Sequence, residues 1–386
     1  MTWAGAYQES FKTAEESIGR LGELSISAGR IRRVIEQIGG ERVEERDTAV
    51  ERYKRMDIPK QDAGSSAVEP PEIGVISADG GRYQRRDYFG EKNRPPGRKH
   101  WREDKVGCLL SMTGPSYESD PVPKLPEWLK VSSAIAEMAK IAEKTGNLED
   151  SINLETEDRD LREEEEFPSP NLVSREVLAS GEDWESFGWQ LAARAWQHGF
   201  PGAKRLAFVA DGAAINWAIH RRHFSNAVPV LDLMHALAYG YSAAKAVGGD
   251  VYPQWAQWIW AGEVDRVIAA LRAHQERLGR PPDDAGEADP RKRVDRALVY
   301  YTNQRTRMDY PKYRRLGLPL TSSNIESTVK QVNRRVKGTE KFWLGPTSEA
   351  ILQLRADYLS SSEPLDRFWI RYHARQTGSN AYKQAS

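Results

Sequence analysis

The chain has 386 residues, 39% of them hydrophobic and 29% charged, a length that suits two or three domains with a large core. No run of about 18 apolar residues suggests a membrane span, and the first residues lack the basic and apolar regions of a secretory signal. The single cysteine, Cys108, excludes an internal disulfide and a multi-cysteine zinc site, and it fits a cytoplasmic location.

Charge is distributed unevenly, although Lys and Arg together equal Asp and Glu at 56 each. Residues 291–340 carry 13 basic and 4 acidic side chains, and residues 82–105 carry 9 and 4. Residues 149–166 carry 2 and 10, which cancels part of this excess. Basic segments are typical of nucleic-acid binding because phosphate contacts release counterions. An ordinary solvated surface is the alternative.

Residues 1–56 are predicted to be helical. Ser27 is a plausible N-cap for a helix that carries Ile31 and Ile35 on one face and ends at Gly39-Gly40. This short helix pair with an Arg-rich second helix is similar to a helix-turn-helix, and a structural helical lead-in is equally compatible. Residues 57–71, rich in Pro, Gly and Ser, are predicted to be a linker.

Residues 72–235 alternate between predicted strands and helices. A strand at 72–79 and a second, antiparallel strand at about 99–112 precede a proline-rich loop at 113–126 and a helix at 127–145. The acidic stretch at about 147–170 is low in apolar residues and is predicted to be a flexible insert. The pattern then predicts the elements helix 183–199, strand 205–211, helix 212–224 and strand 228–232.

The remainder is predicted to be almost entirely helical. Residues 233–313 form a long helical stretch, broken at Gly248-Gly249 and at 280–290. A helix opened by Glu326 and a final pair at 346–360 and 363–374 follow. This order predicts a mixed α/β fold with one large helical insertion.

Two aspartates share the same local context. Asp79 and Asp211 each follow an apolar strand that ends in Ala, and each precedes Gly. Gly permits a tight exit turn, so both carboxylates would project from the edge of a sheet. The alternative is that Asp-Gly is a plain turn dipeptide.

A third acid, Glu326, opens the helix that begins after Leu320. Ser323 and Glu326 have the spacing of a capping box, which needs no metal. Helical spacing also puts Glu326 on one face with Lys330, Asn333 and Lys337. That face suits a metal site beside a phosphate backbone, and it suits a simple Glu–Lys pair equally well.

Several motifs, taken together in order, resemble the bacterial insertion-sequence transposases of the DDE class, in particular the ISKra-type branch. The matching segments extend over residues 70–375 and are Ile76-Ser-Ala-Asp79-Gly-Gly, Trp101-Arg-Glu-Asp-Lys105-Val-Gly, Val209-Ala-Asp211-Gly-Ala, Val230-Leu-Asp232-Leu-Met-His235-Ala, Leu318-Pro-Leu-Thr-Ser-Ser-Asn-Ile-Glu326, and Arg335-Val-Lys-Gly338 with Trp343. The resemblance implies an RNase H-like mixed sheet flanked by helices, with a core formed by 72–235 and 321–386. It also implies that residues 236–320 are a helical insertion between the second and third catalytic acids.

The resemblance further implies a DNA transposase. Asp79, Asp211 and Glu326 would hold two Mg²⁺ or Mn²⁺ ions for cleavage at the transposon ends and for strand transfer into target DNA. The expected partners are DNA and a second copy of the chain, as a homodimer on DNA, with no membrane. The expected location is the bacterial cytoplasm, in association with the nucleoid.

The expected DNA contacts lie on and near the third acid's helix. They are Lys330, Arg334, Arg335, Lys337 and His235. His235 belongs to an Asp-x-x-His motif with Asp232, and the alternative is a buried Asp–His pair that holds the insertion against the sheet. Two other functions remain open: an RNase H-like nuclease without strand transfer, and a non-catalytic DNA-binding transposase remnant. Many relatives carry a longer, cysteine-containing N-terminal region, so a truncated N-terminus would favour the remnant.

Overall fold

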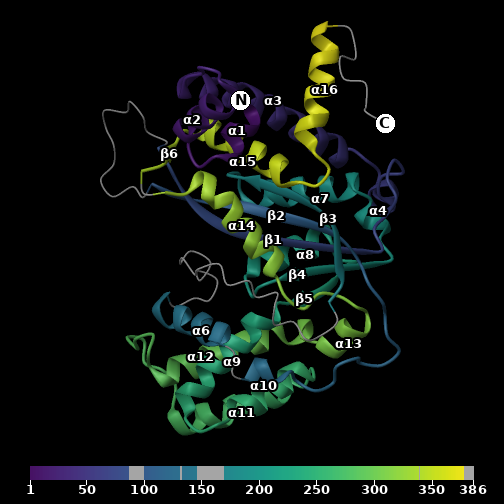
Figure 1. Ribbon diagram of the computed structural model, residues 1–386. Helices are drawn as coiled ribbons and strands as arrows, with labels where there is room; N and C mark the ends of the chain where they lie inside the picture. Colours follow the sequence, from purple (N-terminus) through teal and green to yellow (C-terminus); the bar gives the residue numbers. More distant parts are fainter. Residues whose placement is uncertain (87–99, 131–132, 146–168, 339, 378–386) are drawn as a thin grey trace.

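The computed structural model describes residues 1–86, 100–130, 133–145, 169–338 and 340–377 (Figure 1). The strands are β1 (Ile73–Arg85), β2 (Trp101–Thr113), β3 (Asn171–Ser180), β4 (Arg205–Ala210), β5 (Val228–Leu231) and β6 (Phe342–Trp343). The helices before β4 are α1 (Thr2–Tyr7), α2 (Phe11–Gly22), α3 (Ala28–Lys54), α4 (Ile58–Ala63), α5 (Glu127–Lys130), α6 (Ser133–Thr145) and α7 (Trp184–Gln197). Those after it are α8 (Ala214–His223), α9 (Leu233–Val247), α10 (Tyr252–Trp260), α11 (Val264–Leu278), α12 (Pro290–Gln304), α13 (Tyr310–Arg315), α14 (Ser323–Val336), α15 (Gly345–Leu359) and α16 (Pro364–Thr377).

The strands form one mixed, six-stranded sheet in the order β3-β2-β1-β4-β5, with the short β6 added to the end of β1. β1 and β2 are antiparallel from Ile73↔Met112 to Gln84↔Trp101, and β3 continues the antiparallel part. β4 and β5 run parallel to β1. Parallel neighbours need a crossover connection, and α8 provides it between β4 and β5. The predicted α/β class, with a mixed sheet between helices, is therefore confirmed.

Helices cover both faces of this sheet. On one face α14 lies across β1 and β2, and α15 lies beside it over β3 (Figure 1). On this side the Cys108 thiol donates to Thr328 Oγ1 of α14 at 3.2 Å. The preceding residue of the strand, Gly107, faces α7, where a Cβ would come within 2.8 Å of Leu191. The alternation of β2 thus directs its side chains to two different helices.

The predicted helical region at 233–313 is confirmed as α9 to α13, with breaks at the expected places. Together with α6 these helices form a lobe below the sheet (Figure 1). Trp260 is fully buried there, and its indole N–H donates to the carbonyl of Val122 in the proline-rich loop. No described helix combines the length and the apolar character that crossing a bilayer requires.

Two sequence predictions about element ends are wrong, and one strand was missed. α3 does not stop at Gly39-Gly40 but continues to Lys54. Gly39 instead allows a close approach of α15, since a Cβ there would lie 2.7 Å from the carbonyl oxygen of Ala350. β1 does not end at Asp79 but continues to Arg85. β3 was not predicted at all.

Other predictions are confirmed in part or concern residues that the structure does not describe. The predicted linker contains the short helix α4, and the predicted helix at 127–145 is described as α5 and α6. The acidic insert at 149–166 and residues 87–99 of the first basic segment lie outside the described residues.

Candidate metal centre

Asp79 lies in the middle of β1, on the face of the sheet that α14 covers. The strand continues through Gly80 and Gly81, and neither glycine has a positive φ, so the predicted exit turn does not form. The glycines instead allow close approach: a Cβ on Gly81 would lie 2.6 Å from Asn333 of α14. Asp79 is partly buried, and its Oδ1 accepts from the Gly80 N–H at 2.7 Å.

Asp211 follows the last residue of β4 directly, as predicted. It is 7% exposed, and its Oδ1 accepts from the Ala213 N–H at 3.0 Å and from Asn216 Nδ2 at 2.8 Å. Gly212 has no room for a side chain, because a Cβ would lie 2.4 Å from the ring of Tyr300 on α12. The turn after β4 is thus fixed by the helical lobe.

Glu326 stands in the first turn of α14, but the predicted capping box is wrong. The N-cap is Ser322 rather than Ser323. The Ser322 hydroxyl lies 3.2 Å from Glu326 Oε1, so the carboxylate is held by a side chain and not by the N-cap amide. The side chain of Glu326 is partly buried.

Asp79 of β1, Asp211 after β4 and Glu326 of α14 lie near enough to interact through their charges, but Asp79 and Asp211 do not belong to the described group whose ligand atoms lie within 4.8 Å of one another. Burial raises the pKa of Asp79 well above its usual range, and the nearby Asp211 and Glu326 carboxylates raise it further. Burial likewise raises the pKa of Glu326. Carboxylates that repel one another in a partly desolvated place need a cation or a proton.

Asp232 joins β5 and α9 to the start of α14. Its Oδ1 accepts from the backbone N–H of His235 at 2.7 Å and pairs with Nδ1 of the same residue at 2.9 Å. Its Oδ2 accepts from the backbone N–H and the hydroxyl of Ser322. Asp232 is 1% exposed and His235 is 2% exposed, so the buried Asp–His pair considered from the sequence is present.

His235 lies beside Asp232 and Glu326. The name acid cluster denotes Asp79, Asp211, Asp232, His235 and Glu326. One ligand atom each from Asp232, His235 and Glu326 lie within 4.8 Å of one another. Burial alone would lower the pKa of His235, but Asp232, Glu326 and Asp211 outweigh burial and raise it to about 10. A protonated imidazole donates from both nitrogens and cannot ligate a metal. Its buried Nε2 has no hydrogen-bond partner among the described residues, so this N–H suits an anionic oxygen.

The donor chemistry fits a hard divalent cation. Asp79, Asp211 and Glu326 offer carboxylate oxygens, the ligands that Mg²⁺ and Mn²⁺ prefer. Asp232 is a poorer ligand because four donors already occupy its two oxygens. Of the three acids predicted from the sequence, only Glu326 belongs to the described group whose ligand atoms lie within 4.8 Å of one another. Asp79 and Asp211 remain predicted ligands, and Asp232 orients Ser322 and His235.

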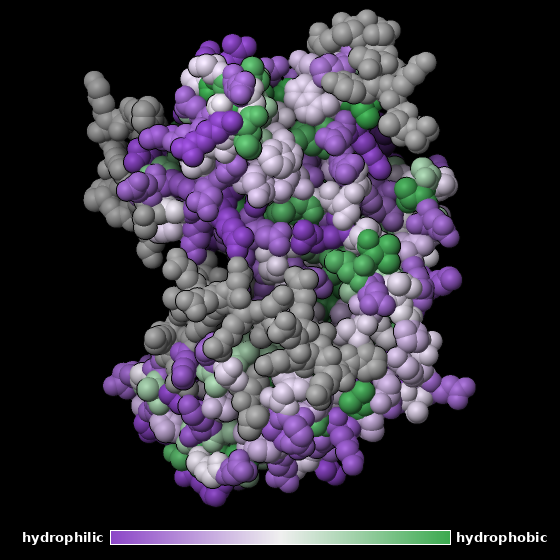
Figure 2. All heavy atoms as spheres, in the orientation of Figure 1, coloured by the Kyte–Doolittle hydropathy of each residue, from purple (hydrophilic) through white to green (hydrophobic). Residues whose placement is uncertain are grey.

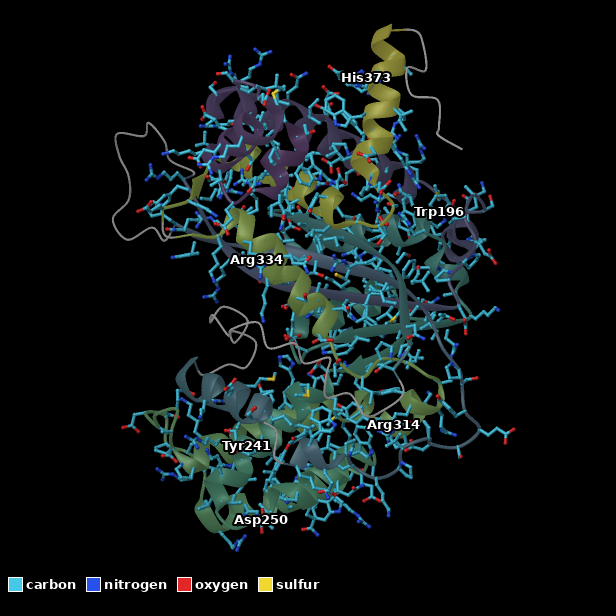
Figure 3. All side chains as sticks on the ribbon, in the orientation of Figure 1. Trp196, Tyr241, Asp250, Arg314, Arg334 and His373 are labelled. Atoms are coloured by element: carbon cyan, nitrogen blue, oxygen red, sulfur yellow. The ribbon has the colours of Figure 1, made fainter. Side chains whose placement is uncertain are left out.

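Cationic side chains continue along α14. Lys330 is close enough to Glu326 to oppose the rise of its pKa, and Lys337 acts in the same way on Asp104. Arg334 is exposed, and Figure 3 shows it near the end of α14 that is farther from the helical lobe. On the face shown in Figure 2, hydrophilic residues gather where α14 crosses the sheet in Figure 1.

Arg335 does not belong to this surface, and the expectation that it contacts DNA beside Lys330 is wrong. It is 1% exposed, and its Nε donates to the carbonyl of Gly5 at 2.8 Å. Nine residues separate it from Glu326, which on a helix of 3.6 residues per turn places the two on opposite sides.

Two residues near the site carried no separate signal in the sequence. Ser322 owes its place in the site to Asp232, 90 residues earlier in the chain, and Asp104 was part of a motif but had no role assigned. In comparisons with known proteins, no family model and no curated protein matches this chain.

Proposed function

We propose that the chain is a DNA transposase of the DDE class, which cleaves transposon ends and transfers the strand into target DNA with divalent metal ions. The observation that carries the proposal is the neighbourhood of Asp79, Asp211 and Glu326: burial, and then the charges of Asp211 and Glu326, raise the pKa of Asp79. A structural role alone gives no reason to gather three acids in a partly buried place.

The sheet supports the RNase H-like fold that this function implies. Three antiparallel strands are followed by two that run parallel to the first, and helices α9 to α13 lie between the second acid and the third along the chain. The first acid lies on the central strand β1, and the second follows the adjacent strand β4. The third reaches them from α14, which lies on β1.

Each residue of the site has a chemical role in this proposal. Asp79, Asp211 and Glu326 would hold one or two Mg²⁺ or Mn²⁺ ions. Such ions, when bound, activate the attacking hydroxyl and stabilise the charge that develops on the phosphate. The Nε2–H of His235 would donate to a non-bridging phosphate oxygen, while Asp232 keeps the ring protonated and oriented.

The DNA backbone would lie along the cationic face of α14, on Lys330, Arg334 and Lys337. Phosphate contacts of this kind position the duplex without reading its sequence. A homodimer that pairs two DNA ends, and a bacterial cytoplasmic location at the nucleoid, belong to the same proposal.

The test is metal-dependent processing of a donor DNA with terminal inverted repeats. The wild-type chain should nick the end with Mg²⁺ and then join the 3′ end to a target plasmid. Asp79→Asn, Asp211→Asn and Glu326→Gln should each lose cleavage by at least about 10³-fold and still bind DNA. Asp265→Asn, an exposed acid on α11, is the matched control and should retain activity. Retained cleavage in Asp79→Asn would contradict the proposal.

The products separate the two alternatives. Nicked donor without joined product indicates a nuclease, which uses the same acids. DNA binding without any nicking, at all Mg²⁺ and Mn²⁺ concentrations, indicates a non-catalytic remnant.

A further inference from the structure

A second cavity lies on the other side of α14 from the acid cluster. It has a volume of about 440 Å³, within the range of about 300–1,000 Å³ that is usual for small-molecule sites. Its walls come from the start of α2, the end of α14, and β6 with the residues around it. The lining side chains on which the argument depends are three aromatic ones, Phe11, Phe342 and Trp343, and three basic ones, Arg86, Arg335 and Lys341.

Arg335 is a buried cation that has no acidic partner among the residues the structure describes. Its Nε and Nη1 donate to the backbone carbonyls of Gly5 and Glu9, and its Nη2 has no partner among the described residues. Burial, with the nearby Arg355, lowers the pKa of Arg335 to about 10. Burying a charge costs free energy unless an opposite charge compensates it, so this wall of the cavity favours an anion.

The neighbouring Lys341 strengthens this preference. Burial and the charge of Arg335 lower the pKa of Lys341, and its Nζ donates to the carbonyl of Arg334 at 3.1 Å. Four basic and two acidic side chains line the cavity, and one of the basic ones, Arg32, is paired with Glu36 outside it. The remaining excess is positive.

The aromatic rings of the cavity favour a ligand that also has a planar group. Phe11 and Trp343 meet edge to face at 6.2 Å, and the Arg335 guanidinium lies 4.5 Å from the centre of the Phe11 ring. The Arg86 guanidinium lies 4.2 Å from the centre of the Phe342 ring. Phe11 and Phe342 are partly exposed. Aromatic rings and guanidinium planes are the surfaces on which unpaired bases stack.

We infer that this cavity binds a nucleotide, with its base stacked on the Phe342–Arg86 side and its phosphate held by Lys341, while the charge of the buried Arg335 behind the wall favours the anion. The nucleotide has two possible sources: a free nucleoside monophosphate, or an unpaired nucleotide of a DNA strand. Only the second source rests on the proposed function.

For a nucleotide that belongs to a DNA strand, the position of the cavity sets how many nucleotides separate it from the acids. Phe342 pairs with Gln84, five residues beyond Asp79 on β1, and a strand rises about 3.3 Å per residue. Arg335 lies nine residues beyond Glu326 on α14, at about 1.5 Å per residue. The rise is thus about 17 Å along β1 and about 14 Å along α14, and the cavity also lies across α14 from the acids. A connecting strand therefore needs at least about five nucleotides at 3.4 Å per nucleotide.

Calorimetric titration of the full chain with dAMP tests the inference. The titration is done in EDTA, so that neither metal binding nor cleavage contributes to the heat. The wild-type chain should bind dAMP more tightly than inorganic phosphate. Lys341→Gln should weaken dAMP binding by about tenfold, and Phe342→Leu should weaken dAMP by about tenfold while leaving phosphate unchanged. Arg266→Gln, which removes an exposed charge on α11, should change nothing.

Two further measurements decide whether the nucleotide is free or part of DNA, and they separate this inference from the proposed function. A duplex with a five-nucleotide single-stranded end that competes with dAMP, where a blunt duplex does not, assigns the site to DNA; failure to compete assigns it to a free nucleotide. Asp79→Asn should bind dAMP as the wild type does, so loss of transposase activity and loss of this site are independent results. Equal affinity for dAMP and phosphate, or unchanged dAMP binding in both cavity variants, would overturn the inference.

Discussion

Asp104 of β2 lies directly opposite Gly81 of β1, fully buried, and neither of its carboxylate oxygens has a hydrogen-bond partner among the described residues. Asn333 of α14 faces the same spot, and its Oδ1 is also unpaired. A Cβ on Gly81 would lie 2.8 Å from Asp104 Oδ1 and 2.9 Å from Asn333 Oδ1. A neutral Asp104 has an O–H to give to a nearby acceptor such as this amide, whereas an ionised one does not.

This arrangement predicts a pH-dependent stability. Burial raises the pKa of Asp104 to about 7, against roughly 3.9 in an unfolded chain. The folded state therefore holds the proton more tightly, and the stability from Asp104 is fully present below about pH 4 and lost as the pH rises through 7. Asp104→Asn keeps a donor and removes the titration. Its free energy of unfolding should exceed that of the wild type by about 2–4 kcal/mol at pH 8 and by about 1–2 kcal/mol at pH 5.

Urea unfolding at the two pH values measures this difference. Asp265→Asn, which is exposed, should give the wild-type curve at both. An Asp104→Asn gain that is the same at pH 5 and pH 8 would show that Asp104 does not titrate in this range.

The contact between Gly212 and Tyr300 predicts a steric effect. In Gly212→Ala the new Cβ would lie 2.4 Å from a ring that is stacked on Tyr239 with 3.8 Å between ring centres, so the ring cannot move away easily. The variant should be destabilised by about 1–3 kcal/mol, measured by urea unfolding. Gly286→Ala is the matched control, since nothing lies within 4 Å of its Cβ. Adding Tyr300→Leu should recover part of the loss, and no recovery would argue against the clash.

Ser322 and Ser323 are adjacent serines with different predicted effects. Ser322 is 4% exposed and touches both Asp232 and Glu326, whereas the hydroxyl of the exposed Ser323 lies 3.4 Å from that of Thr321. Under the proposed function, Ser322→Ala should lower the rate of DNA cleavage by about 10–100-fold, because residues that orient metal ligands have effects of this size. Ser323→Ala should leave the rate unchanged. Equal rates in the two variants would show that Glu326 needs no positioning by Ser322.

The cationic face of α14 predicts a salt dependence. The slope of log K against log salt for duplex binding should fall by about 0.9 for each phosphate contact that is removed. Lys330→Gln and Lys337→Gln should each reduce the slope by about this amount. Arg266→Gln, far out on α11, should leave it as it is. Slopes that match the wild type in both lysine variants would exclude this face as the DNA surface.

The sequence predicts much of this fold because many elements have local signals. The antiparallel hairpin of β1 and β2, the strand before Asp211 and the helical lobe are confirmed, since apolar period and glycine breaks mark them. β3 was missed because its first three residues are exposed and Arg175 and Glu176 interrupt its apolar pattern. Its partners on β2 are distant in sequence, so only pairing reveals it.

The site shows the same division. Asp211 follows its strand as predicted, but Asp79 does not end one, because the Asp-Gly signal cannot distinguish a turn from a close backbone approach. The error at Arg335 was avoidable, since helical geometry alone turns it away from Glu326. The role of Ser322 was not predictable, because it depends on Asp232, 90 residues earlier in the chain.

The 90 residues that separate Asp232 from Ser322 have a consequence for folding during synthesis of the chain. Five strands, the whole helical lobe and two of the three acids precede Ser322, whereas Glu326 comes 247 residues after Asp79. Domains fold progressively as the chain is synthesised, and contacts this distant form late. An incomplete chain that ends before α14 therefore has most of the sheet but no complete acid cluster. Under the proposed function, the ribosome could not release a premature product able to cut DNA.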